Sequence, residues 1–270
     1  MIFTEKEAWE IVDLSIERVR RLDSGVRDKI YSIVLYNSLA RGDFLPDVSD
    51  IDTMIVMKMP NVVFPEAEAK LIMNIFEEES KRFRTEAPRG RHHGAAVVDC
   101  IAFGELELPL RGRTLIPTNT VLAPPEIKPL GIYAFDFVKY SRVLFGENFI
   151  PYLEVKPPKV FIPERAKRMK PRLQAALEHE PVRLPMIAGE ALRLAELYFG
   201  EHDLDKRKML HNFMKYVPEF PLKAFSQTLF RQYLDPVYFT SKSSKKLKDF
   251  YETCFDFANQ IINLILQRSS

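Results

Sequence analysis

The sequence predicts an α+β domain followed by an all-α domain, and three observations support this prediction. Runs of β-branched and aromatic residues typical of buried strands occur in the first half of the chain. These runs lie at 30–35, 54–57 and 95–103. Helical periodicity surrounds them and continues without strands after a proline-rich stretch at 151–163. We therefore expect two domains, residues 1–150 with a sheet and residues 151–270 as a helical bundle.

Helix signals define the remaining elements. Thr4 and Glu7 form a capping box that begins an amphipathic helix over about 4–22, and Pro65 begins a second helix that ends near 83. Residues 106–110 alternate as in an edge strand, and a helix beginning at about 132 is predicted to end at Gly146. The helices expected in the second domain cover 163–178, 184–199, 205–216, 219–234 and 244–267.

A polar stretch joins the first two strands and carries the first candidate site residues. Asp50 and Asp52 are two residues apart on a predicted strand, so their side chains point to the same face. Two carboxylates on one face repel each other unless a cation lies between them. Hard oxygen ligands of this kind suit Mg²⁺, which keeps its other positions for water and substrate phosphates.

The residues before these aspartates suit a phosphate. Asn37 and Ser38 end the first strand, and backbone amides with a serine hydroxyl at a sharp turn can hold phosphate oxygens. Arg41 adds a positive guanidinium nearby. Metal carboxylates, a turn of this kind and an arginine favour phosphoryl chemistry, whereas the alternative is a solvated polar loop between two core strands.

At this point the sequence resembles a known family. Ser-Leu-Ala-Arg-Gly at 38–42 and Ser-Asp-Ile-Asp at 49–52 are similar to the signature of the DNA polymerase beta-like nucleotidyltransferase superfamily, closest to its minimal and aminoglycoside nucleotidyltransferases. Asn37 stands where the family has glycine, and asparagine enters left-handed backbone conformations more readily than most residues. The resemblance implies a small mixed sheet with helices on one side.

The resemblance also implies a third carboxylate on a later strand. Asp99, within the strand at 95–103, is the candidate, and the alternative is a position at an exposed sheet edge. With Asp50 and Asp52 it would hold two Mg²⁺ ions and help to orient or deprotonate the attacking hydroxyl. By the same resemblance, Asn37, Ser38 and Arg41 would bind the phosphates of ATP or another nucleoside triphosphate, and AMP or another nucleoside monophosphate would be transferred.

The second domain carries one further candidate. Glu190 lies on a helix of small and apolar residues and could take a proton from an acceptor hydroxyl in a cleft between the domains, as the aminoglycoside enzymes imply. The alternative is a surface ion pair with Arg193. The acceptor itself is open: a small-molecule hydroxyl, a partner protein that is nucleotidylated, or no acceptor in a nucleotide-binding regulator without turnover.

Bulk properties limit the partners. The formal net charge of +2 counts against a dedicated nucleic-acid binder, and no apolar run is long enough for a membrane span. Cys100 and Cys254 have no zinc or redox spacing, so we expect a soluble protein of the reducing cytoplasm. The oligomeric state is open.

Overall fold

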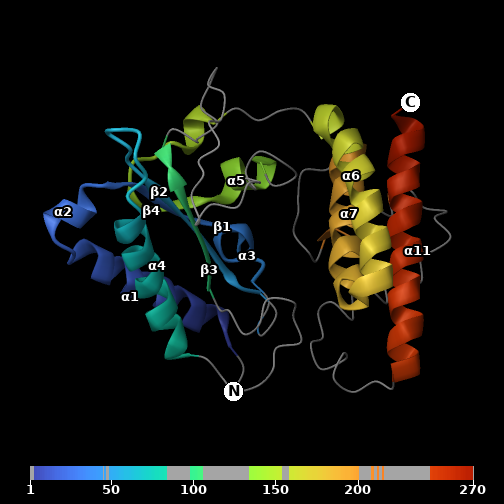
Figure 1. Cartoon of the computed structure of the whole chain (residues 1–270), viewed down its shortest axis with the longest axis horizontal. Helices are drawn as coiled ribbons and strands as arrows, with labels where there is room; N and C mark the ends of the chain where they lie inside the picture. Colours follow the sequence, from blue (N-terminus) through green and yellow to red (C-terminus); the bar gives the residue numbers. More distant parts are fainter. Residues whose placement is uncertain are drawn as a thin grey trace. The chain divides into compact units, whose positions relative to one another are not determined.

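The structure is a computed structural model, and its described residues form two compact units. The first unit is drawn from residues 1–88 and 95–155 and the second from residues 156–270, and each is described by itself (Figure 1). The described residues are 3–44, 46, 49–83, 98–105, 134–153, 158–200, 208, 209, 212, 215 and 244–269.

A mixed four-stranded sheet forms the centre of the first unit, in the order β3-β2-β1-β4. β1 is antiparallel to both β2 and β4, whereas β2 is parallel to β3. The strands are β1 (Ile30–Tyr36), β2 (Ile51–Met57), β3 (Val98–Gly104) and β4 (Arg142–Gly146). β1 and β2 are the central strands and are buried along almost their whole length, as their apolar runs predicted. The mixed sheet confirms the predicted fold class.

Two long helices cover one face of this sheet (Figure 1). Helix α1 (Glu5–Arg20) begins at the predicted capping box, and α4 (Glu66–Lys81) lies close to its predicted range. Their apolar faces pack on β1 and β2 through a buried cluster. An ion pair clamps the two helices together, because Arg18 Nη1 contacts Glu79 Oε1 at 2.8 Å and the Glu79 side chain is only 1% exposed.

The opposite face is covered by shorter pieces. Helix α5 (Ala134–Tyr140) places Phe137 against the sheet, and Phe149 and Ile150 join the same cluster from the following segment. Ile150 opens the 3-10 helix η3 (Ile150–Tyr152). Tyr36 and Phe137 lie in ring contact, with centroids 5.7 Å apart. The side chains of Val34 and Tyr36, near the end of β1, therefore point to this face of the sheet.

The prediction of one helix up to Gly146 is wrong. The chain leaves α5 after Tyr140 and forms β4, which pairs with the free side of β1. Val143, Leu144 and Phe145 are β-branched, aliphatic and aromatic, so an unpaired sheet edge can draw them into a strand despite the helical spacing before them. Long-range backbone pairing has overridden the local pattern.

The second unit is helical. Helices α6 (Pro158–His179), α7 (Leu184–Phe199) and α11 (Ser244–Arg268) pack against one another (Figure 1). A single 3-10 turn, η4 (Pro181–Arg183), separates α6 from α7. Helix α6 begins within the proline-rich stretch at 151–163 that was expected to separate the two domains. It does so because Ile162, Ala166, Met169 and Leu173 repeat at helical spacing and are buried.

Several predicted elements lie outside the described residues. They are the edge strand at 106–110, the helix at 219–234, and the helix at 205–216 apart from positions 208, 209, 212 and 215, which are helical. Within the described part of the chain, no helix combines the length and apolar character that crossing a membrane requires.

Gly146 gives the first test of this fold. Its φ is +81°, and an added Cβ would lie 2.3 Å from the carbonyl oxygen of Tyr31, which accepts the β4 edge hydrogen bond from the Glu147 amide. Gly146→Ala should therefore lower the free energy of unfolding by more than the roughly 1–2 kcal/mol of a left-handed alanine alone. Chemical denaturation followed by circular dichroism measures this loss.

Gly189 supplies the matched control. It lies inside α7 with no atom within 4 Å of an added Cβ. Gly189→Ala should leave stability unchanged or raise it by roughly 0.5–1 kcal/mol, because alanine is the better helix former. Equal stability of the Gly146→Ala variant and the parent would contradict the position of β4.

Candidate active site

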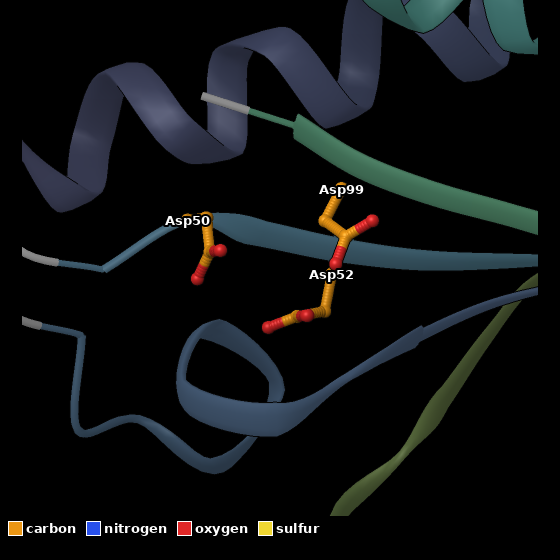
Figure 2. Close-up of side chains that lie close together, drawn as sticks. All are labelled: Asp50, Asp52 and Asp99. Carbon is orange, nitrogen blue, oxygen red and sulfur yellow. The ribbon is translucent and has the colours of Figure 1, made fainter. Parts of the chain in front are cut away.

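Three aspartates converge at one end of the sheet (Figure 2). Asp50 immediately precedes β2, Asp52 lies on β2, and Asp99 lies on β3. The parallel register between the two strands places Asp52 opposite Asp99. One carboxylate oxygen from each of the three residues lies within 4.8 Å of the others. The structure thus brings together the three carboxylates that the sequence and the family resemblance nominated.

The surroundings of these carboxylates suit a divalent cation. Asp52 is buried, with 5% of its surface exposed, whereas Asp50 and Asp99 are half-buried. Like charges at this separation in a partly dehydrated site repel one another, and a bound cation removes the repulsion. Three carboxylates that lie on or directly before two strands, two of them only half-buried, match the ligand chemistry that Mg²⁺ prefers.

The predicted turn lies beside Asp52. Tyr36 pairs with Asp52 in the β1–β2 ladder, and the short helix α3 (Asn37–Arg41) follows Tyr36 directly. Asn37 has a φ of +61°, which lies in the left-handed region that glycine enters most readily. The sharp turn therefore forms without glycine, because asparagine tolerates this region of φ and ψ better than most side chains. Ser38 is buried within the turn.

Arg41 does not extend toward solvent. Its Nε and Nη2 donate hydrogen bonds to the two carboxylate oxygens of Asp43 at 2.9 and 3.1 Å, and its Nη1 donates to Asp136 Oδ2. The Arg41 side chain is only 7% exposed. Burial lowers the pKa of this guanidinium, but the charges of Asp136 and Asp43 outweigh burial and raise it. Arg41 is thus a buried, permanently charged group with two carboxylate partners.

Tyr36 is a site residue to which the sequence analysis gave no role. Its side chain is almost fully buried, and its hydroxyl has no hydrogen-bond partner among the described residues. Burial raises the pKa of Tyr36 well above its ordinary value, and the charges of Asp52 and Asp99 raise it further. The phenol therefore stays neutral beside the carboxylates. An aromatic residue directly before the Asn-Ser turn was the only local signal.

Asp43 and Asp136 were also missed. Asp43 follows the motif by one residue and could have been suspected, since an aspartate two residues after an arginine can reach it. Asp136 lies 95 residues from Arg41 in sequence, and no local pattern connects them.

Glu190 lies in the second unit, on α7. Its Oε1 accepts hydrogen bonds from Arg165 Nε and Nη2 at 3.1 and 2.8 Å, and its Oε2 accepts one from Arg172 Nη1 at 3.4 Å. Its side chain is 12% exposed. The surface ion pair considered from the sequence named Arg193, but the arginines that hold Glu190 come from α6. They hold the carboxylate between two helices.

The first half of the chain resembles a known protein family. A family model described as a nucleotidyltransferase domain matches residues 15–86, which contain the turn, Asp50 and Asp52. A search of curated proteins finds no significant match.

Among solved structures, the chain is similar to the spectinomycin adenyltransferase AAD(9) from Enterococcus faecialis, determined with ATP and spectinomycin. The TM-score is 0.53 with 9% identity, over 93% of this chain and 99% of that chain. At this identity the likeness shows a shared fold. The comparisons therefore show a match to a nucleotidyltransferase domain over residues 15–86 and a shared fold over most of the chain.

Proposed function

We propose that the protein transfers a nucleoside monophosphate from ATP to a hydroxyl group of a small-molecule acceptor. The observation that carries this proposal is the convergence of Asp50, Asp52 and Asp99 within 4.8 Å, the first two of them inside the part of the chain that matches a nucleotidyltransferase domain. AAD(9), which shares the fold, was determined with ATP and with the small molecule spectinomycin, and this supports the choice of donor and of acceptor class.

The three aspartates are the proposed metal ligands. Asp52 and Asp99 face each other across β2 and β3, and Asp50 extends the set from the residue before β2. Two bound Mg²⁺ ions would neutralise the triphosphate and lower the pKa of the acceptor hydroxyl. Asp99, on β3, would orient that hydroxyl or accept its proton.

The Asn37–Ser38 turn is the proposed phosphate site. The left-handed Asn37 directs the chain sharply from β1 into α3, so successive amides at the helix start can face an anion. Arg41 was predicted to neutralise phosphate charge directly. Because its guanidinium is committed to Asp43 and Asp136, we assign it no direct contact with a phosphate.

Two assignments concern the rest of the chain. We propose residues 1–150 as the catalytic domain and residues 151–270 as the helical domain. We also propose the cytoplasm as the compartment, since both cysteines are free thiols.

Magnesium dependence tests the metal ligands. Increasing Mg²⁺ should raise the melting temperature of the parent protein, because an ion that binds only the folded state adds roughly 2.7 kcal/mol of stability at a hundredfold excess over its dissociation constant. Asp52→Asn should lose most of this increase. The control is Asp13→Asn, an exposed aspartate on α1, which should respond like the parent. An equal response of all three proteins would remove Asp52 from the metal site.

Label transfer tests the reaction. Incubation with Mg²⁺, ATP labelled at the α-phosphate and a fractionated cell extract should yield a labelled small molecule and release pyrophosphate. Asp50→Asn should reduce the rate at least about a hundredfold, since charge stabilisation at the transferred phosphate is lost. Label in a protein band would favour protein nucleotidylation instead. ATP binding with no pyrophosphate release for any acceptor would favour a regulator without turnover.

The role of Glu190 as a general base remains a prediction, and its arginine partners allow it to be tested. A catalytic base should lose about 10²–10⁴-fold in kcat when Glu190 becomes Gln, whereas Arg165→Gln should change mainly the stability. A carboxylate that serves only to join α6 and α7 predicts similar losses of stability and no change in kcat for both variants. Initial rates and thermal melts of the two variants distinguish these outcomes.

A further inference from the structure

A buried ion cluster stands next to the proposed phosphate site, and the proposed function has not used it. It consists of Arg41, Asp43 and Asp136, hereafter the Arg41 cluster. The geometry points to Asp136 as a positioning residue that, with Asp43, locks Arg41 and so holds the Asn37–Ser38 turn in the shape that receives the nucleotide phosphates. This inference rests on the proposed function for the identity of the ligand.

The contacts of the cluster account for every nitrogen of the Arg41 guanidinium. Asp43 receives a fork of two hydrogen bonds from Nε and Nη2, and Asp136 receives the one from Nη1. Such paired geometry fixes both distance and orientation, which a single point charge cannot do. These bonds use three of the five N–H donors of Arg41, and turning its Nε–Nη2 fork toward a phosphate would break both bonds to Asp43.

Burial makes that exchange unfavourable. The side chains of Arg41, Asp43 and Asp136 are 7%, 3% and 1% exposed. Removing one partner of a buried pair leaves an uncompensated charge in a poorly polarisable environment. The same carboxylates that surround Arg41 also cancel the positive charge it would present to an incoming anion. The cluster therefore holds the Arg41 side chain in one position.

The turn needs such a constraint because α3 is short. A helix of five residues, Asn37–Arg41, is far below the length at which a helix is stable by itself. Its end is closed by two amides, those of Gly42 and Asp43, which donate to the Ser38 carbonyl at 3.0 and 3.1 Å. Arg41 is the last residue of α3, so fixing its side chain fixes the end of α3, and the Asn37–Ser38 turn lies at the other end of this short helix.

Two neighbouring residues of α5 contact the chain on either side of the Asn37–Ser38 turn. Asp136 holds Arg41 at the end of α3, and Phe137 packs on Tyr36, the residue directly before Asn37. The Asn37–Ser38 turn is therefore clamped between two contacts from one helix that is distant in sequence. A shift of α5 would move the turn relative to Asp52, which is paired with Tyr36.

The test uses variants that preserve shape. Asp136→Asn removes the charge and keeps the side-chain volume, and Arg41→Lys keeps the charge and removes the fork. The double variant completes a thermodynamic cycle. Glu79→Gln is the matched control, because Glu79 is an equally buried carboxylate that pairs with Arg18 in the same unit but joins α1 to α4.

The first readout is amide hydrogen exchange without nucleotide. Asp136→Asn should accelerate exchange of the Gly42 and Asp43 amides, which close α3, by roughly tenfold or more, and Glu79→Gln should leave these amides unchanged. Unchanged exchange of both amides in Asp136→Asn would overturn the inference.

The second readout is nucleotide binding and turnover below the melting temperature of every variant. Asp136→Asn and Arg41→Lys should each weaken ATP binding and raise the KM for ATP by about tenfold, and the double variant should be no weaker than either single one. Glu79→Gln should lower stability without changing the KM. Unchanged or tighter ATP binding by Asp136→Asn would overturn the inference.

The two readouts separate the inference from the proposed function. If the parent protein binds no ATP, the proposed function fails, while hydrogen exchange still decides whether Asp136 holds the turn. If the parent binds ATP and the variants match it, the proposed function stands and the positioning role fails.

Discussion

The register between β2 and β3 is the constraint on which the site depends. It sets Asp52 opposite Asp99, while the two-residue repeat of a strand keeps Asp50 on the same side as Asp52. Asp52 and Asp99 cannot leave this arrangement unless a whole strand slips in register. Such a slip would turn the buried apolar residues of β2 outward. Hydrophobic burial thus holds like charges together, an arrangement whose repulsion a cation between them would relieve.

The same sheet explains the position of the Asn37–Ser38 turn. β1 ends at Tyr36, opposite Asp52, so the turn that follows it begins beside the carboxylates. The covering helices do different work on the two faces. α1 and α4 bury the apolar side of β1 and β2 and are joined by Arg18 and Glu79. On the other face, α5 controls the residues around the turn, through one aromatic contact and one ion pair.

Arg41 shows that a motif residue can serve a motif indirectly. Its position beside the turn suggested a phosphate contact, yet it is buried with Asp43 and Asp136. Buried ion pairs are weak sources of net stability, but they specify one arrangement over its alternatives. Asn37 shows the converse. It departs from glycine in the related motif, and its left-handed φ of +61° preserves the turn.

Local sequence determined the features that depend on neighbours along the chain. The capping box of α1, the strand periodicity of β2, the common face of Asp50 and Asp52 and the turn at Asn37 all act over a few residues.

Only the tertiary structure decided which distant groups meet. It turned 142–146 into an edge strand, joined Arg41 to Asp136 across 95 residues, and set Arg165 and Arg172 against Glu190. These contacts form because a buried charge or an open strand edge must find a partner wherever the chain supplies one, and sequence separation has no part in that requirement.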